Sequence, residues 1–402
     1  MALHSTFEEI RKGRNTAKLE NRDVVIMKRP LLIALGIATL VKLVLAAVTI
    51  GTNDVVTWRS FADNAMLCGA CAYQFPGPTG DPFNHPPFII HFLKLIGTST
   101  TWFPFWLRLP AILADIGTVL LVTRLLPRIS TRLVVLLALN PVSILVSGFH
   151  GNTDPLMIFF IVLTVYLLKA GRLNWAAAAF AMAINIKVVP LLLVPAILVY
   201  IWSRKSVRGV VVFGCIAAVV VLALSMPYIV SNPLVIGKAT LGYRGMYGQW
   251  GISRILLGFT TSLTFHKIAA RLTQTLIIVL TLALSVYLNR RKIDLVYQIG
   301  LIFFALFFLS SGVAVQYLSW PVPFILALGF WWSLAYYTSA GLYIFLSYNH
   351  WSGGQWYFAE SHINPYSSVA GYMAGLLCWT ICGFICFRYI QILKPQKGTK
   401  ST

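Results

Sequence analysis

Acidic residues, and charged residues as a whole, are scarce in this sequence. Of its 402 residues only 11 are Asp or Glu, against 32 Lys or Arg, and the four types together make up 11% of the chain. A soluble chain of this length needs more charge than that to cover its surface. The low charge and the 58% hydrophobic content therefore exclude an ordinary soluble protein and predict an integral membrane protein.

Other features are missing as well. The sequence shows no repeat of 20 to 50 residues and no obvious inverted repeat, which excludes a solenoid and gives no sign of a transporter built from two halves. Too little polar sequence remains for a separate soluble domain. The first 30 residues are polar and basic, unlike a signal peptide, so we expect the apolar run from Leu31 to stay as an anchor.

The six cysteines carry little functional information. Cys68 and Cys71 form one CxxC without a second pair, which indicates a local disulfide or an incidental pair rather than a metal site. Cys378, Cys382 and Cys386 recur every four residues along one helical face, which favours packing.

Long apolar runs dominate the chain. A membrane-spanning helix needs about 20 apolar residues, so the sequence predicts an all-α polytopic bundle of about 12 transmembrane helices. The runs cover 31–50, 104–124, 133–149, 155–169, 173–187, 189–202, 209–228, 271–288, 293–310, 318–334, 336–348 and 366–388. A shorter run at 86–97 predicts an interfacial or re-entrant helix. We divide the chain into a basic tail (1–30), one transmembrane domain (31–390, with an outer loop at 51–103) and a second tail (391–402).

The basic residues predict the orientation. A net charge of +21 would suit a nucleic-acid partner, but the Lys and Arg residues fall in short clusters between apolar runs, as the positive-inside rule describes. We therefore predict no nucleic-acid binding, cytoplasmic termini and membrane lipids as the surroundings. The opposite side then receives Asp54, Asp63, Asp81, His85, His150, Asp154, Arg244, Tyr317, Glu360 and His362.

Asp54 follows the first apolar run and opens the outer loop that contains Trp58 and Asn84-His85-Pro86-Pro87. A carboxylate at the membrane surface can deprotonate a hydroxyl beside a lipid-borne substrate; the alternative is a solvated loop residue. The two prolines exclude a helix at that point. They either aim His85 at the membrane surface or form an ordinary turn.

Four later segments also carry polar residues on the outer side. His150, Asn152 and Asp154 would bind a sugar or a phosphate, or simply form a connector. Lys187, at the end of a short run, would either extend to the interface or hold a lipid phosphate. Arg244 requires an anionic partner, either a head group or an acidic side chain. Gln316, Tyr317 and Trp320 would stack on and hydrogen-bond a sugar, although an aromatic belt also explains the Tyr and Trp.

Taken in order, these motifs resemble a known family. An early outer Asp54 is followed by Asn140-Pro141-x-x-Ile144, then by His150-Gly151-Asn152-x-Asp154, Lys187-x-x-Pro190 and Gln316-Tyr317-x-x-Trp320. The order resembles that of the GT-C glycosyltransferases that use polyprenyl-phosphate sugars, over roughly residues 31 to 330. It is most similar to family 87 of the glycosyltransferases and to the catalytic subunit of glycosylphosphatidylinositol mannosyltransferase I.

The resemblance implies a GT-C-like fold and inverting transfer of a hexose, most often mannose, from a polyprenyl-phosphate donor to a lipid or glycan acceptor. Asp54 would be the general base, and the donor phosphate would be bound by Lys187, Arg244 and His150. The sugar or acceptor would be contacted by Trp58, His85, Asn152, Asp154, Gln316, Tyr317 and Trp320. His150 stands where the eukaryotic relatives have Arg. Asp54 stands alone where they often have Asp-x-Asp, so we expect neither a metal nor a cofactor.

Two other function classes are open. A transporter or flippase of lipid-linked sugars would place ionisable residues deep in its spans, where Lys42 and Asp115 are the clearest examples. A non-catalytic assembly partner is the third class. The sequence favours a bacterial plasma membrane with an outward-facing site, and an endoplasmic reticulum membrane with a lumenal site has the same geometry.

Overall fold

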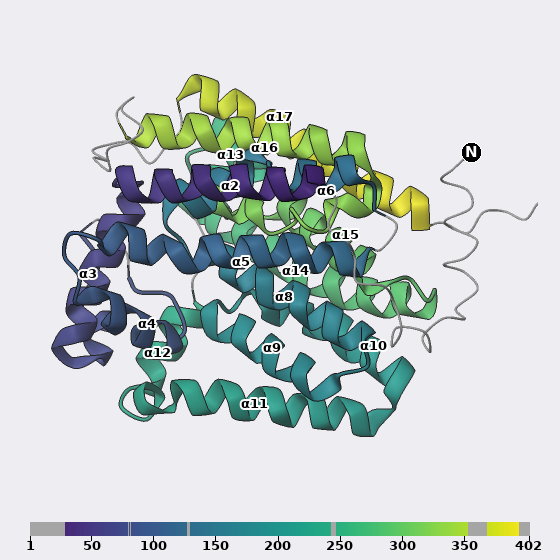
Figure 1. Ribbon diagram of the computed structural model, residues 1–402, viewed down its shortest axis with the longest axis horizontal. Coiled ribbons are helices and arrows are strands. Elements are labelled where there is room, and N and C mark those ends of the chain that lie inside the picture. Colours follow the sequence, from purple (N-terminus) through teal and green to yellow (C-terminus); the bar gives the residue numbers. More distant parts are fainter. Residues whose placement is uncertain are drawn as a thin grey trace, which may run out of the picture.

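The computed structural model describes residues 29–78, 80, 82–126, 129–242, 247–352 and 368–393. This part of the chain is helical and contains no strand beyond one isolated bridge between Tyr247 and Gly312. The long helices lie side by side as a bundle (Figure 1). Helices satisfy their own backbone hydrogen bonds, which lipid requires. The predicted all-α polytopic membrane fold is therefore confirmed.

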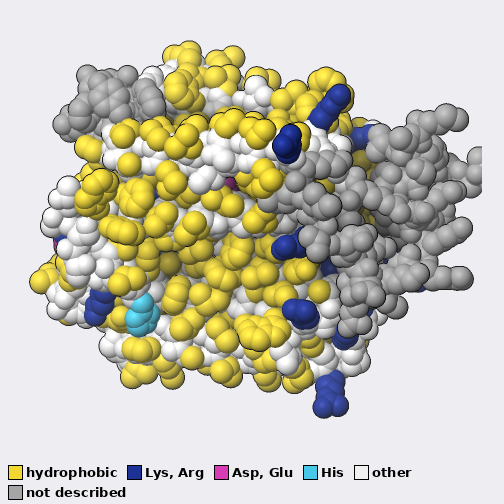
Figure 2. Space-filling model, in the orientation of Figure 1, with side chains coloured by type: hydrophobic (Ala, Val, Ile, Leu, Met, Phe, Trp, Pro, Cys, Tyr) yellow, Lys and Arg dark blue, Asp and Glu magenta, His cyan; other side chains and the backbone are white. Residues whose placement is uncertain are grey.

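Six segments of the described chain are long and apolar enough to cross a membrane. They are α2 (Arg29–Val48), α5 (Phe103–Leu125), the segment Thr131–His150, α11 (Val207–Ile229), α14 (Leu263–Arg290) and α17 (Val369–Leu393). The segment Thr131–His150 comprises α6 (Thr131–Ala138), α7 (Pro141–Ser143) and the π-type turn η3 (Ile144–His150). Apolar side chains cover most of the visible described surface (Figure 2). The count of about 12 spans stays a prediction.

Helices outside this set account for most of the remaining apolar runs. They are α8 (Asp154–Lys169), α9 (Leu173–Ile186), the short η4 (Val189–Leu193) with α10 (Val194–Lys205), α15 (Leu295–Leu309) and α16 (Phe330–Trp351). The cysteine stripe on α17 is buried, with Cys378 and Cys382 fully enclosed. Packing is therefore the observed role of that stripe.

The predicted helix at 318–334 is wrong. That segment forms the short 3-10 turns η5 (Val315–Ser319) and η6 (Ile325–Leu328), and α16 begins only at Phe330. Pro321 and Pro323 lack the backbone N–H that an α-helix uses.

Tyrosine hydroxyls hydrogen-bond this irregular backbone from neighbouring helices. Tyr336 donates to the carbonyl of Leu318 at 2.6 Å, and Tyr337 to that of Val322 at 2.8 Å. Tyr389 of α17 donates in the same way to Phe324. Non-helical backbone is tolerated at membrane depth where protein encloses it.

The expected outer loop at 51–103 also contains more structure than predicted. It holds α3 (Asn53–Cys68), η2 (Ala70–Tyr73) and α4 (Phe88–Gly97). The α4 helix confirms the helix predicted at 86–97, whereas α3 was not predicted and places Asp54 in its first turn rather than in a loop. The stretch between α11 and α14 likewise contains two short helices, α12 (Pro233–Leu241) and α13 (Gly251–Phe259). Cys68 and Cys71 form a disulfide, so the local-disulfide alternative holds.

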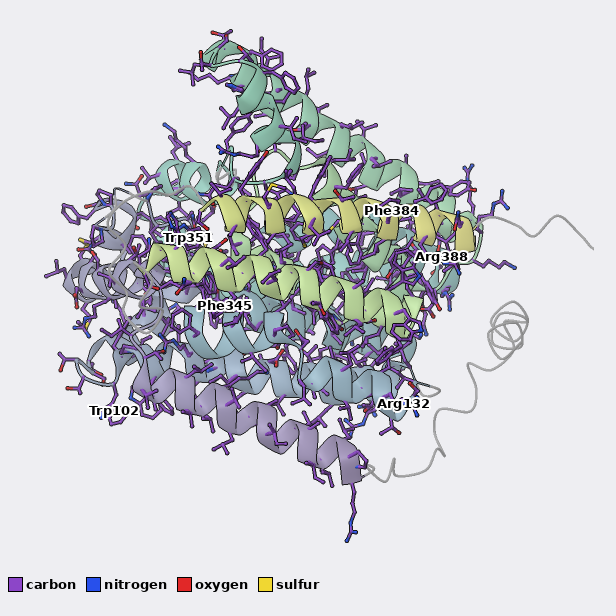
Figure 3. The ribbon with its side chains drawn as sticks, turned by 90° about the horizontal axis from the view of Figure 1, so that it is seen from above. Trp102, Arg132, Phe345, Trp351, Phe384 and Arg388 are labelled. Atoms are coloured by element: carbon purple, nitrogen blue, oxygen red, sulfur yellow. A yellow bond between two sulfur atoms is a disulfide. The ribbon has the colours of Figure 1, made fainter. Side chains whose placement is uncertain are left out.

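The two ends of the bundle differ in chemistry. Figure 3 shows Arg132 and Arg388 at one end and Trp102 and Trp351 at the other. The last turns of four helices carry Arg124, Lys169, Arg204 with Lys205, and Arg290. The end of α2 and the start of α5 lie at the opposite end of the bundle from the last turn of α5. Asp54 follows the end of α2 closely and therefore lies at that opposite end too.

Candidate active site

Arg108 stabilises the turn that precedes Asp54. Its side chain is fully buried on α5, and its Nη1 donates to the carbonyls of Ala46 at 3.3 Å and Thr49 at 3.0 Å. A second guanidinium nitrogen donates to the carbonyl of Ile50. These carbonyls lie at the C-terminal end of α2, where the last carbonyls of a helix have no hydrogen-bond donor within the helix. Arg108 thereby stabilises the end of α2 directly before the site.

Gly51 then allows the chain to turn into α3. Its φ is +98°, a left-handed conformation that favours glycine. A Cβ atom there would lie 2.0 Å from the Arg108 guanidinium and 2.6 Å from the Phe149 carbonyl. The turn therefore requires glycine, and it places Thr52 and Asp54 against the end of η3.

Asp54 meets His150 at this junction. The Nε2 atom of His150 lies 3.1 Å from Oδ2 of Asp54, and the Asn152 amide lies 3.5 Å from the same oxygen. The His150 ring stacks on Tyr348 of α16 at 4.9 Å between centroids. The His150 side chain is 1% exposed, whereas that of Asp54 is 34% exposed. The carboxylate is thus held from the protein side and open on the other.

The electrostatic surroundings favour an ionised Asp54. Burial raises the pKa of Asp54, but the charge and the hydrogen bond of His150 oppose burial, with smaller contributions from Lys187 and Asn152. The net result is a pKa below the ordinary value of an aspartate. Asp54 is therefore a carboxylate at neutral pH, as a general base must be.

Lys187 forms the second half of the site. It caps the C-terminal end of α9, and its Nζ lies 2.8 Å from Oδ1 of Asp154. The indole of Trp320 donates to the same oxygen at 2.6 Å. The ammonium also lies 4.3 Å from the ring centroid of Tyr317, which stacks on Trp320. Lys187 is 7% exposed, so its charge is enclosed by the protein rather than extended to a surface.

His85 and Trp58 join the outer segment to this cluster. The two rings lie 4.6 Å apart, and Nδ1 of His85 lies 3.4 Å from the carbonyl of Ile186, beside Lys187. Burial, and then the charge of Lys187, lowers the pKa of His85 to about 4. His85 is therefore a neutral imidazole at physiological pH. Side chains from Asp54 to Tyr348, far apart in the sequence, thus converge at one end of the bundle.

Most of the predicted site residues lie in this cluster. Two of them cannot be assigned a side-chain contact in this cluster. Gln316 is partly buried next to Tyr317 on η5, and Arg244 lies outside the described residues.

Sequence reasoning missed Thr52, Arg108 and Tyr348. Arg108 had a signal, because a charged residue inside an apolar run is costly and needs partners. Tyr348 had none, since only the packing of α16 brings it to His150.

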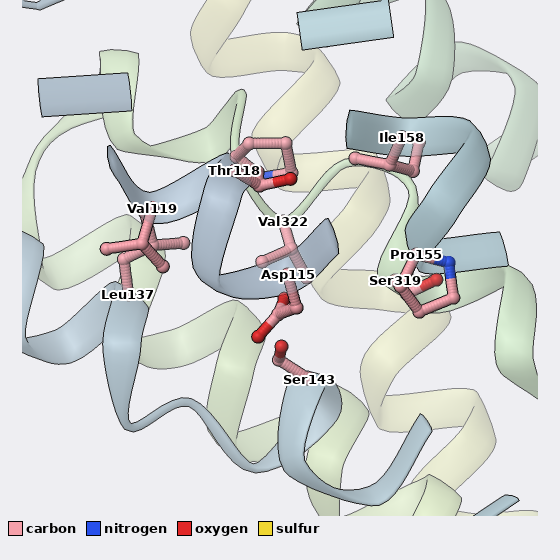
Figure 4. Close-up of a pocket in the computed structure, with 10 residues that line it drawn as sticks. Asp115, Thr118, Val119, Leu137, Ser143, Pro155, Ile158, Ser319 and Val322 are labelled. Carbon is pink, nitrogen blue, oxygen red and sulfur yellow. The ribbon is translucent and has the colours of Figure 1, made fainter. Parts of the chain in front are cut away.

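A small cavity lies deeper in the bundle (Figure 4). Its volume is about 20 Å³, and its polar lining comes from Asp115, Thr118, Ser143 and Ser319. That volume suits about one water molecule and is too small for a sugar. Lys42 hydrogen-bonds to Asp115 and lies 3.3 Å from the Ser143 hydroxyl, so the two deep charges pair with each other.

No group of three or more His, Cys, Asp or Glu side chains is placed to hold a metal in the part of the chain described here. Metal independence stays a prediction.

The all-α membrane fold agrees with a GT-C membrane glycosyltransferase, a class that the match to a family model supports. The chain belongs to the ALG3 protein family, whose model matches residues 130–381, more than half of its length. The match supports a mannosyltransferase but does not single out family 87 or the glycosylphosphatidylinositol enzyme. It includes Lys187 and Asp154, while Asp54 precedes it. No curated protein matches the chain.

Proposed function

We propose that this protein transfers mannose, with inversion, from a polyprenyl-phosphate donor to a lipid-linked glycan. The observation that carries the proposal is the partly exposed Asp54 carboxylate, hydrogen-bonded by buried His150 and close enough to Lys187 to interact with its charge. The ALG3 family supports mannosyl transfer between lipid-linked molecules. The donor's polyprenyl phosphate and the individual residue roles are part of the proposal.

In the proposed reaction, Asp54 takes the proton of the acceptor hydroxyl. The acceptor oxygen attacks the anomeric carbon, the bond from that carbon to the phosphate oxygen breaks, and the electron pair leaves with the lipid phosphate. One displacement inverts the anomeric centre. A phosphate is a good leaving group, so no strong general acid is needed, and a positioned base of this kind contributes about 10²- to 10⁴-fold.

The lipid phosphate would bind near Lys187, whose charge stabilises the charge that develops on the leaving group. Arg244 keeps its proposed phosphate role. The geometry favours a different role for His150, because its two ring nitrogens face Thr52 and Asp54. Sugar and acceptor contacts stay proposed for Trp58, His85, Asn152, Asp154, Gln316, Tyr317 and Trp320. Of these residues only Gln316 is partly exposed; the others, and Lys187, are enclosed here and would have to become accessible to a substrate.

We also propose that the site faces the non-cytoplasmic side. The basic helix ends lie at the other end of the bundle, which supports cytoplasmic termini. The Cys68–Cys71 disulfide lies on the same side as Asp54, at the end of α3, and disulfides persist in oxidising compartments. We place the protein in a bacterial plasma membrane; a lumenal site in the endoplasmic reticulum would have the same geometry.

The test uses the purified full chain in detergent with synthetic polyprenyl-phosphate mannose and a lipid-linked glycan. Wild type is expected to transfer mannose, and the Asp54→Asn variant to bind the donor without transfer. No turnover by wild type that still binds polyprenyl phosphate would overturn the proposal and favour the transporter class. Mannose that stays attached to an acceptor excludes both that class and an assembly role.

A further inference from the structure

His150 connects Asp54 to the interior of the protein. Thr52 Oγ1 lies 2.8 Å from Nδ1 of His150, and Asp54 Oδ2 lies 3.1 Å from Nε2. Thr52 is 2% exposed, so the order Thr52, His150, Asp54 runs from the interior outward. Nδ1 faces the Thr52 oxygen, while Nε2 faces the Asp54 oxygen and also lies 3.5 Å from the Asn152 amide nitrogen, which in turn lies 3.5 Å from Oδ2 of Asp54. The Tyr348 ring covers one face of the imidazole at an interplanar angle of 9°.

The hydrogen-bonding capacity of these groups determines where the protons lie. The Asp54 carboxylate can only accept, so the Nε2 atom that faces it must donate. In the neutral ring Nδ1 is then an acceptor, and the Thr52 hydroxyl donates to it. In the imidazolium both nitrogens donate, and the Thr52 hydroxyl has another acceptor, the His150 carbonyl at 3.3 Å. Both ring nitrogens and the Thr52 hydroxyl therefore have hydrogen-bond partners in the neutral ring and in the imidazolium. In both states Nε2–H points at Asp54.

We propose that His150 is a positioning residue for the base: its Nε2–H holds Oδ2 of Asp54 so that the other carboxylate oxygen faces the acceptor hydroxyl, and Thr52 and Tyr348 hold the imidazole. This inference rests on the proposed function, in which Asp54 is the base. It assigns His150 to the base rather than to the donor phosphate.

The arrangement predicts a change in pH dependence. His150 and Lys187 lower the pKa of Asp54 by their charge, the Asn152 amide lowers it by a hydrogen bond, and His85 and Tyr348 are close enough to interact with it. Burial acts in the opposite direction. Without His150, burial is opposed mainly by Lys187, so the pKa of Asp54 rises. The acidic limb of kcat/KM then moves to higher pH.

The experiment measures kcat, KM and the pH profile of kcat/KM for the full chain with His150→Leu and His150→Gln. The Gln amide retains a donor at a similar reach, and Leu does not. In His150→Leu we expect kcat to fall at least about tenfold, donor KM to stay within about twofold and the acidic limb to move to higher pH. His150→Gln is expected to recover part of both effects. A merely structural role would lower activity without moving the limb, and that result overturns the proposal.

A second pair of variants covers the case in which His150→Leu does not fold. Thr52→Val removes the hydroxyl at nearly constant volume, and Thr52→Ser keeps it. Thr52→Val is expected to lower kcat more than Thr52→Ser does; equal rates for Thr52→Val and wild type overturn the inference.

Nitrogen-15 spectra of histidine-labelled wild type, assigned with His150→Gln, give a readout that does not need activity. A protonated Nε2 on His150 at neutral pH supports the arrangement, and a bare Nε2 overturns it. Absent transfer by wild type would instead count against the proposed function, so the two failures are distinguishable.

Discussion

Lys187 and Asp154 form a buried ion pair between the end of α9 and the start of α8, with 2.8 Å between Nζ and Oδ1. Tyr317 of η5 and the following Trp320 also contact the pair. These contacts together join three segments that are separate in sequence. A charge buried in this way is tolerated because its partner is present.

Removal of one partner should therefore lower the stability of the protein. We expect Lys187→Met to lower the free energy of unfolding by about 3–5 kcal/mol, because Asp154 is left buried and unpaired. Denaturant or thermal unfolding in detergent measures this. The matched control is Lys169→Met, whose pair with Asp294 has both side chains 28% exposed and should contribute at most about 1 kcal/mol. Equal effects of the two substitutions would show that the Lys187 pair is not enclosed.

Removal of the base should abolish transfer but preserve the fold. We expect Asp54→Asn to lower kcat by about 10²- to 10⁴-fold, the range of general-base contributions, while donor binding persists. The control is Asp63→Asn on the same helix, since Asp63 is half exposed and pairs with Arg59 at 2.8 Å. Radiolabelled mannose transfer measures both variants. Turnover near the wild-type rate in Asp54→Asn would remove Asp54 from the mechanism.

Variants of the buried pair Lys42–Asp115 can distinguish an enzyme from a transporter. We expect Lys42→Met alone to destabilise the protein, because Asp115 loses its partner. The double variant Lys42→Met/Asp115→Leu should recover most of that stability and retain mannose transfer. Unfolding and transfer assays measure the two effects. A stable double variant that has lost transfer would implicate the pair in function.

The stability of the protein should depend on pH through His85. Its pKa is lowered to about 4 in the folded protein, against an ordinary 6.5. The unfolded chain therefore takes up this proton first as the pH falls, and stability decreases from about pH 6.5 down to about pH 4, by up to about 3 kcal/mol. Unfolding of wild type and His85→Gln across this range measures the effect. The variant should lose part of the slope, and an unchanged slope would contradict the prediction.

The disulfide offers a test of sidedness. After treatment with a membrane-impermeant reductant, we expect the exposed Cys68 to react with an impermeant maleimide from the outside of intact cells. The variant Cys68→Ser/Cys71→Ser should lose this labelling, since Cys378, Cys382 and Cys386 are buried. Cys215 is exposed on α11, a candidate span, and should stay unlabelled. Labelling only after the membrane is opened would reverse the proposed orientation.

Much of the fold was predictable from local sequence. The apolar runs became helices because a chain in lipid must satisfy its own backbone hydrogen bonds. The run at 318–334 is not a helix because Pro321 and Pro323 interrupt it, and apolarity alone does not separate an α-helix from an enclosed irregular segment. The helix α3 was missed because its sequence is mixed in polarity, and its buried face is defined only by packing against α4 and α5.

The sequence by itself determined the membrane class, the segregation of basic residues to one end and the identity of most polar residues at the other. These properties depend on composition and on the order of residues along the chain. Only the tertiary structure decided which groups meet: His150 with Asp54, Lys187 with Asp154, and Arg108 with the end of α2. Such pairings join residues dozens of positions apart, and they form because a buried charge or helix end must find its partner wherever the packed helices provide one.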